Sequence, residues 1–207
     1  MNPLSISAKT VDDIVSSAWD AVIEKINNGH PISSEKTLCF LFAMALFEKI
    51  GSALVIDFEN QCYDMLEGES KYLDLLFYTD TSFKVAVEFK LPRKSQSGGS
   101  NQPQTRQAIY RDIARLKYLK GNSIKAGACY FLMAINEHAY LNKGKYRNHV
   151  DLQVHHGHEV VANNALIASG LSLTGAEFKF NWRMVKKIPD GKYICDGSYA
   201  WLSPIKV

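Results

Sequence analysis

Two runs of alternating apolar residues, separated by a short polar turn, set the strictest limit on the fold of this chain. The stretch from 71 to 92 reads KYLDLLFYTDTSFKVAVEFKLP. Its alternating apolar positions are Leu73, Leu75, Phe77, Val85, Val87, Phe89 and Leu91. Because successive side chains of a strand point to opposite faces, this pattern predicts a β-hairpin with one wholly apolar face. The opposite face then carries Asp74, Glu88 and Lys90.

The pairing register of this hairpin follows from the same pattern. A slip by one residue turns the apolar set of one strand toward the polar face, so paired residues must match in face. With the turn near Asp80 and Thr81, the nearest matching register pairs Leu75 with Val87 and Leu73 with Phe89. That register places Asp74 opposite Glu88, with Cβ atoms about 5 Å apart. Lys90 follows on the same face, roughly 7 Å along the strand.

Two carboxylates at this separation repel each other unless a cation lies between them or one of them takes a proton. Hard oxygen ligands favour Mg²⁺ or Mn²⁺. A lysine beside such a metal is expected to have a lowered pKa, and to orient or deprotonate a water molecule. The three residues Asp74, Glu88 and Lys90 therefore indicate a hydrolytic site for phosphodiesters.

The flanking sequence predicts an α/β fold, in which helices flank a mixed central sheet. Helices are expected at 11–27, with Thr10 as N-cap, at 34–50 and at 103–119; strands are expected at 53–58, 71–78, 83–91 and 126–135. The last third, 137–207, is predicted to be a β-rich extension of the same sheet, with strands at 178–185 and 199–207 and a short helix within 164–173. No domain boundary is evident, so 1–207 is interpreted as a single domain.

Asp74, a 13-residue gap and then Glu88-Phe89-Lys90 resemble the motif of the PD-(D/E)XK, or restriction-endonuclease-like, nuclease superfamily. The predicted order αβββαβ, from about 34 to 136, is similar to that superfamily's core. The resemblance implies that Asp74 and Glu88 are metal ligands with the Phe89 carbonyl, and that Lys90 is the catalytic lysine. It implies Mg²⁺ or Mn²⁺ as cofactor and double-stranded DNA as substrate. Many relatives act as dimers, so the resemblance also implies a homodimer.

Members of this superfamily often add a glutamate from the helix before the first strand. Glu35 is the best candidate, and Glu48 is the alternative; Glu35 is also suited to a first-turn position favoured by the helix dipole. Two positions depart from the superfamily pattern. Leu73 stands where the motif's name has proline, and Arg106-x-x-x-Tyr110 stands where some members have Gln-x-x-x-Tyr.

The net charge of +3 hides an uneven distribution. Between 89 and 125 there are nine basic residues and one acid, Asp112, so this window carries +8 and the other 170 residues carry −5. A basic stripe of this kind is expected of a groove that follows phosphates, or of a solvated helix face. On the helix, Arg106, Tyr110 and Lys117 are predicted to share an outer face. The predicted nucleic-acid contacts are Arg93, Lys94, Gln104, Arg106, Gln107, Tyr110 and Arg111.

Other features limit the remaining possibilities. No apolar run approaches the roughly 20 residues that cross a bilayer, and no signal peptide is evident, so a cytoplasmic protein without a membrane partner is expected. The four cysteines are far apart and are expected to be reduced. The HHGH run at 155–158 favours a turn over a metal site. A second basic cluster, Lys179, Arg183, Lys186 and Lys187, is expected to contact DNA flanks or to be a solvated strand end.

Three functions fit this sequence. The first is a metal-dependent endonuclease, and the second is a nuclease-fold module that binds nucleic acid with its site unused. The third is a protein-interaction factor without a nucleic-acid role.

Overall fold

The computed structural model describes residues 6–63, 66, 71–93, 102–122, 124, 126–144, 152–162, 166–168 and 171–207. It is a mixed α/β structure, which confirms the predicted class. Its α-helices are α1 (Val11–Asn27), α2 (Glu35–Ile50) and α3 (Gln102–Gly121), with 3₁₀ turns η1 (Gly51–Ala53) and η2 (His138–Tyr140). The long strands are β1 (Val55–Gln61), β2 (Tyr72–Tyr78), β3 (Val85–Lys90) and β4 (Ala128–Ile135). The short strands are β5 (Glu159–Val161), β6 (Leu166–Ala168), β7 (Leu171–Ser172), β8 (Glu177–Lys179), β9 (Trp182–Arg183), β10 (Val185–Lys187), β11 (Tyr193–Cys195), β12 (Ala200–Leu202) and β13 (Ile205–Lys206).

The central sheet has the strand order β1-β2-β3-β4-β12-β9, and β13 also pairs with β4. Strands β3 and β4 are parallel, whereas the other pairs of this sheet are antiparallel. The sheet is therefore mixed, as predicted. Because parallel neighbours require a crossover connection, α3 runs between β3 and β4 and packs against both.

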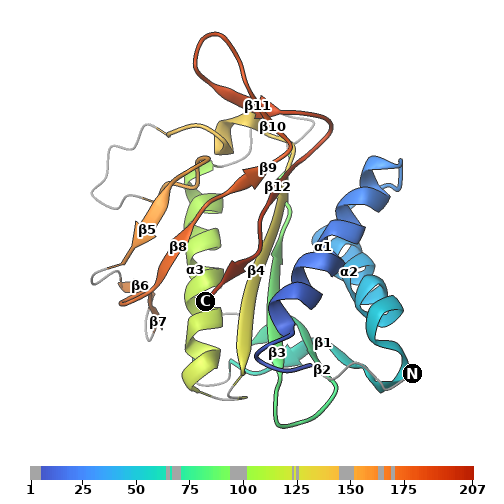
Figure 1. The fold of residues 1–207 in the computed structure, drawn as a ribbon. Coiled ribbons are helices and arrows are strands. Elements are labelled where there is room, and N and C mark those ends of the chain that lie inside the picture. Colours follow the sequence, from blue (N-terminus) through green and yellow to red (C-terminus); the bar gives the residue numbers. More distant parts are fainter. Residues whose placement is uncertain are drawn as a thin grey trace.

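The helices cover both faces of this sheet (Figure 1). Helices α1 and α2 lie on one face, where Trp19, Phe42 and Phe89 form a buried aromatic cluster. Helix α3 lies on the other face with part of the C-terminal third, and the inner side chains Ile109, Ile113 and Leu116 are fully buried there, as predicted. The strands are consequently apolar on both faces over much of their length, which differs from the prediction of a hairpin with one polar face.

The N-terminal helices begin and end close to the predicted positions. The Ser34 side chain accepts a hydrogen bond from the Thr37 N–H and caps α2, and Gly51 ends that helix at φ +77°. Thr10 occupies the N-cap position of α1, as predicted, but its side chain makes no capping hydrogen bond; its hydroxyl instead accepts the Ser7 N–H. Strand β1 starts at Val55, after η1, because the chain makes a further tight turn beyond Gly51.

The C-terminal third departs from the predictions in several places. The expected helix within 164–173 is instead the antiparallel pair β6 and β7. The expected strand 178–185 is divided among β8, β9 and β10, and 199–207 contains β12 and β13. In the described part of the C-terminal third, only β9, β12 and β13 extend the central sheet. Strand β5 pairs with β8, β6 with β7, and β10 with β11, and each pair forms a separate two-stranded sheet. No helix in the described part of the chain is long and apolar enough to cross a membrane.

Candidate active site

The register of β2 and β3 is confirmed only as far as Leu75, which pairs with Val87. One residue beyond this pair, the Asp74 Oδ2 atom accepts a hydrogen bond from the Phe89 N–H at 2.8 Å. The expected pairing of Leu73 with Phe89 is wrong, because Leu73 packs in the core beside α3 and Phe89 packs in the core beneath α1 and α2. A side-chain carboxyl group thus takes the place of a ladder carbonyl where the two strands diverge.

Asp74 and Glu88 lie close enough to interact electrostatically, although the ladder of β2 and β3 ends before the predicted pairing of these two residues. Glu88 is only 3% exposed. Burial raises the pKa of Asp74, and the opposing effect of the Phe89 N–H does not cancel it. Burial and the neighbouring Asp74 raise the pKa of Glu88 well above its ordinary value. The pair therefore favours a shared proton or a bound cation over two uncompensated negative charges.

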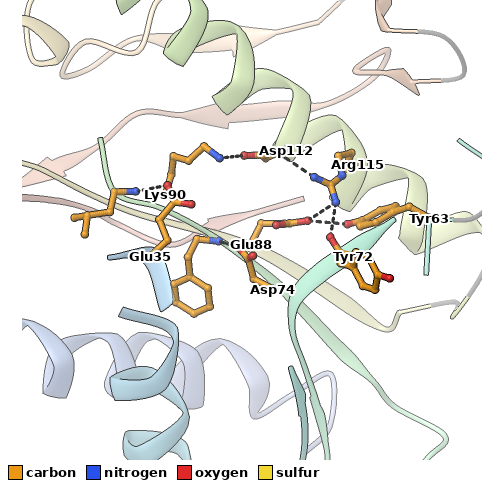
Figure 2. Close-up of polar contacts among 10 residues, drawn as sticks. Glu35, Tyr63, Tyr72, Asp74, Glu88, Lys90, Asp112 and Arg115 are labelled. Atoms are coloured by element: carbon orange, nitrogen blue, oxygen red, sulfur yellow. Dashed lines mark hydrogen bonds and ion pairs between the residues drawn. The ribbon is translucent and has the colours of Figure 1, made fainter. Parts of the chain in front are cut away.

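Glu88 is held from the side of α3 (Figure 2). The Tyr63 hydroxyl donates to Glu88 Oε1 at 3.1 Å, and Arg115 Nη2 lies 3.3 Å from the same oxygen. Arg115 is itself fixed, because it donates to the Tyr72 carbonyl at 2.6 Å and its guanidinium lies 4.2 Å from the Tyr63 ring centre. This buried cation compensates part of the negative charge of the carboxyl pair.

Lys90 forms an ion pair with Asp112 of α3, with Nζ and Oδ2 2.8 Å apart. Burial alone lowers the pKa of Lys90, but the carboxylates of Asp112 and Glu35 outweigh burial and raise it above the ordinary lysine value. This raised pKa describes Lys90 beside its protein partners alone, and the lowered pKa expected beside a bound metal stays a prediction. Here Lys90 is an ammonium group that donates hydrogen bonds and stabilises negative charge.

Glu35 lies at the start of α2 and reaches the end of β3 (Figure 2). Its Oε1 accepts the Leu91 N–H at 3.0 Å. Burial raises the pKa of Glu35, and Lys90 opposes this effect. Glu48, the alternative, is an exposed residue near the other end of α2 and lines a separate apolar cavity with Phe47 and Phe58. Of the two glutamates, only Glu35 adjoins the carboxyl pair.

The site opens to solvent through a pocket of about 390 Å³ between α2 and β1. Glu35 and Asp74 line this pocket, so both carboxyl groups border the space that a ligand would enter. The Phe89 ring is buried, but the backbone N–H of Phe89 faces Asp74. In an extended strand the carbonyl of a residue points toward the same neighbour as its N–H, so the Phe89 carbonyl shares that side. The oxygen atoms of Glu35, Asp74 and Phe89, together with those of Glu88, are the hard donors of the site.

The described residues contain no ready-made cluster of three or more His, Cys, Asp and Glu side chains with metal-binding geometry. The Asp74–Glu88 pair is a two-carboxylate arrangement, and the adjacent, buried carboxyl groups provide the reason to expect a cation there. A backbone carbonyl and water would complete its coordination, which fits the chemistry of Mg²⁺ and Mn²⁺.

The predicted nucleic-acid contacts do not form one surface. Arg106 and Tyr110, expected on the outer face of α3, are 1% and 3% exposed. Arg106 donates to the Ala139 carbonyl and stacks on Tyr140, and Tyr110 donates to the Gln153 carbonyl. That prediction is wrong because the C-terminal third covers the side of the helix that was assigned to solvent.

The remaining predicted contacts differ in their placement. Gln104 and Gln107 are exposed on α3, Arg111 is half-buried, and Arg93 is exposed just beyond β3. Lys94 lies outside the described residues, as does most of the Arg93–Thr105 loop. The +8 window is therefore not a single exposed stripe, since Lys90, Arg106 and Arg115 point inward.

In the second basic cluster, Lys186 and Lys187 are exposed and the other two cations form surface ion pairs. Lys179 pairs with Glu159, and Arg183 pairs with Asp20. The histidines form a turn at Gly157, with φ +82°, as favoured from the sequence; His156 Nδ1 accepts the Trp182 N–H. The four cysteines are free and buried.

Three residues of this site were not predicted to belong to it. Asp112 and Arg115 are one helical turn apart on α3, and Tyr63 follows β1. Asp112 had a usable signal, because it is the single acid within nine basic residues. Arg115 was only one of the nine basic residues in the 89–125 window, and nothing in the sequence marks Tyr63.

No family model matches this chain, and no curated protein matches it in sequence.

Proposed function

We propose that this protein is a metal-dependent nuclease with a restriction-endonuclease-like core. The order α2-β1-β2-β3-α3-β4 supports this proposal, because it agrees with the αβββαβ order expected of that core. Asp74, Glu88 and Lys90 lie on its second and third strands, as the superfamily motif requires. DNA is the preferred substrate on the resemblance alone.

The observation that carries the proposal is the close approach of the carboxyl groups of Asp74 and Glu88 at a buried position, where each shifts the pKa of the other. Two buried acids are held together here by the backbone and by neighbouring side chains, which is costly unless positive charge compensates them. Asp74, Glu88 and the Phe89 carbonyl would hold Mg²⁺ or Mn²⁺, and Glu35 would lie beside them. When bound, the cation supplies a Lewis acid for phosphate oxygens and lowers the pKa of a water molecule.

Lys90 has a separate task in this proposal. As an ammonium group anchored by Asp112, it donates a hydrogen bond to a phosphate oxygen and stabilises the negative charge that grows as water attacks phosphorus. The phosphorus–oxygen bond to the leaving group breaks, and the products are one phosphate monoester and one hydroxyl terminus.

A nuclease-fold binding module is the second candidate, and one observation favours it. Lys90 and Glu88 are each already paired with a residue of α3, so their charges are compensated within the protein. In such a module these ion pairs stabilise the fold, and nucleic acid binds without hydrolysis.

Cleavage assays separate the two candidates. Supercoiled plasmid and circular single-stranded DNA are incubated with Mg²⁺, with Mn²⁺ and with EDTA. The nuclease proposal expects metal-dependent cleavage that Asp74→Asn, Glu88→Gln and Lys90→Met each reduce by at least a hundredfold. If all three variants cleave as fast as the wild-type protein does, the nuclease proposal is ruled out. Binding that weakens with salt, without cleavage, supports the module, and no binding at low salt supports a protein-interaction factor.

A further inference from the structure

Two phenylalanine rings are exposed at the pocket that reaches Asp74. Phe40 of α2 is 56% exposed and Phe58 of β1 is 47% exposed, and both line the pocket together with Glu35 and Asp74. Most large aromatic side chains of this chain are buried in its two cores. Exposed aromatic rings beside convergent polar groups in a concave site are typical of a ligand-binding surface.

The size and position of the pocket suit part of a nucleotide. Its volume of about 390 Å³ falls within the range of about 300–1,000 Å³ in which proteins hold small ligands. Asp74 and Glu35 border one side, and the two rings border another. A phosphodiester at the carboxylates would therefore place its attached nucleoside within reach of the rings.

The charge of the pocket selects which part of the nucleotide enters. Three acids line it, Glu35, Glu59 and Asp74, against the single cation Lys36. Lys36 is itself paired with Glu59 at 2.8 Å. Such a lining repels any phosphate group that is not held at the metal site, but it accepts an uncharged base whose ring N–H or amino groups donate to carboxylates.

Bases in a duplex are covered on both faces by their neighbours, so only an unpaired nucleotide can lay its ring on an aromatic side chain. We infer that the Phe40–Phe58 pocket binds the base of an unpaired nucleotide next to the scissile phosphate. The preferred substrates are then single strands or single-stranded flaps. This inference rests on the proposed function for the position of the phosphate, whereas base binding is measurable without hydrolysis.

A second copy of the chain is the competing occupant of this face. An added strand along β1 would meet Asp57 and Glu59, and Glu59 has φ +53°, which interrupts the extended edge. The apolar surface does continue along α2 to Met44 and Phe47, which line an adjoining cavity with Phe40 and Phe58. Phe47 is 55% exposed and is not among the residues that line the Asp74 pocket, so it provides a matched control.

The test is fluorescence anisotropy with a labelled 12-nucleotide oligothymidylate and a labelled hairpin duplex, at low salt and with EDTA present to prevent hydrolysis. The proteins are wild type, Phe40→Leu, Phe40→Tyr, Phe58→Leu and Phe47→Leu. Because one base–aromatic stack accounts for about a tenfold to hundredfold change in affinity, Phe40→Leu and Phe58→Leu should each weaken single-strand binding by about that factor. Phe40→Tyr, which keeps the ring, and Phe47→Leu should bind as wild type does.

Equal loss in Phe40→Leu and Phe40→Tyr overturns the inference, because affinity then does not depend on the ring. Wild-type affinity in both leucine variants at 40 and 58 also overturns it. If Phe47→Leu loses single-strand affinity and its mass in light scattering is half that of wild type, the apolar face of α2 and β1 instead joins two copies of the chain. Ring-dependent binding without any cleavage in Mg²⁺ leaves the inference standing and removes the proposed nuclease activity.

Discussion

Arg115 Nη2 lies 3.3 Å from Glu88 Oε1 and links α3, the helix that follows β3, to the most deeply buried acid of the site. The cluster as a whole contains four carboxyl groups, Glu35, Asp74, Glu88 and Asp112, and two cations, Lys90 and Arg115. With all six groups ionised, it carries a charge of −2. One divalent cation, or two protons, brings this charge to zero, so cation binding and protonation compete for the same site.

Arg115→Met is expected to destabilise the fold strongly. It leaves Glu88 buried without its cation, and breaking one half of a buried ion pair costs about 3–5 kcal/mol. Urea unfolding measures this as a lower free energy of unfolding. Lys120→Met is the control on the same helix, because Lys120 is exposed and its loss should change stability by less than about 0.5 kcal/mol.

The double variant Glu88→Gln/Arg115→Met provides the second arm of that experiment. Removing both charges leaves no uncompensated ion, so the double variant should recover more than half of the stability that Arg115→Met loses. If the two single losses simply add, Arg115 and Glu88 are not coupled and the assignment of this ion pair is wrong.

Asp74 has a structural task that is separable from its charge. Its carboxyl group accepts the Phe89 N–H at the point where β2 and β3 diverge. Asp74→Asn keeps an acceptor oxygen and should leave stability within about 1 kcal/mol of wild type, whereas Asp74→Ala leaves that N–H unpaired and should cost about 1–3 kcal/mol. Both variants should lose stabilisation by Mn²⁺, as measured by thermal unfolding. Equal stability of the two variants would contradict this division of tasks.

Stability should depend on pH in a direction set by the raised carboxyl pKa values. Glu35, Asp74 and Glu88 have folded-state pKa values above those of the unfolded chain, so the folded state binds more protons than the unfolded state once the pH exceeds about 4. Without divalent cations, stability should therefore fall as the pH rises from about 4 toward the raised pKa values. Unfolding in EDTA at a series of pH values measures this slope.

Mg²⁺ or Mn²⁺ should reverse that trend. Metal binding requires the deprotonated carboxylates, so the increase in Tm with Mn²⁺ should be larger at pH 8 than at pH 5. Glu88→Gln should remove both the part of the slope of stability against pH that Glu88 contributes and the increase in Tm with Mn²⁺. An increase in Tm that is equal at the two pH values would show that the metal binds elsewhere.

Asp112→Asn should act on catalysis through Lys90. The carboxylate of Asp112 is the main charge that raises the pKa of Lys90, so its loss lowers that pKa. If cleavage requires the ammonium form, the alkaline limb of the profile of kcat/KM against pH moves to lower pH, with a smaller effect at neutral pH. A uniform loss at every pH would instead indicate a purely structural role for Asp112.

The local pattern of the sequence was sufficient to predict that Asp74 and Glu88 lie close together at the centre of this site. Alternation within 71–92 predicted the register at Leu75 and Val87, and hence the meeting of Asp74 and Glu88. The long helices and the parallel β4 were predictable because their apolar periodicity is continuous. Glu35 was a sound candidate because a helix start that precedes the sheet brings a first-turn side chain to the strand ends.

The rest depends on contacts between distant parts of the chain. Arg106 and Tyr110 looked solvent-facing because helix periodicity marks only one buried side, and the partners of both residues, Ala139 and Gln153, lie more than 30 residues away in the C-terminal third. Short strands of two or three residues there carry too few positions for alternation to be visible. The ion pairs of Asp112 and Arg115 also need the packing of α3 on the sheet, which no local pattern encodes.

The basic window at 89–125 contains some cations that are buried and others that are exposed, and this difference leads to the last prediction. Arg93 is exposed just beyond Lys90, so Arg93→Ala should weaken nucleic-acid binding and reduce the slope of log affinity against log salt by about 1, with little change in stability. Arg106→Ala should instead lower stability and leave nucleic-acid binding by the folded protein unchanged. It removes a buried side chain that donates to the Ala139 carbonyl, so it should cost about 2–3 kcal/mol of stability while the folded protein keeps the wild-type salt slope. Anisotropy titrations at four salt concentrations, paired with urea unfolding of each variant, measure both quantities. A reduced salt slope in Arg106→Ala would return this residue to the nucleic-acid surface and contradict its assignment to the core.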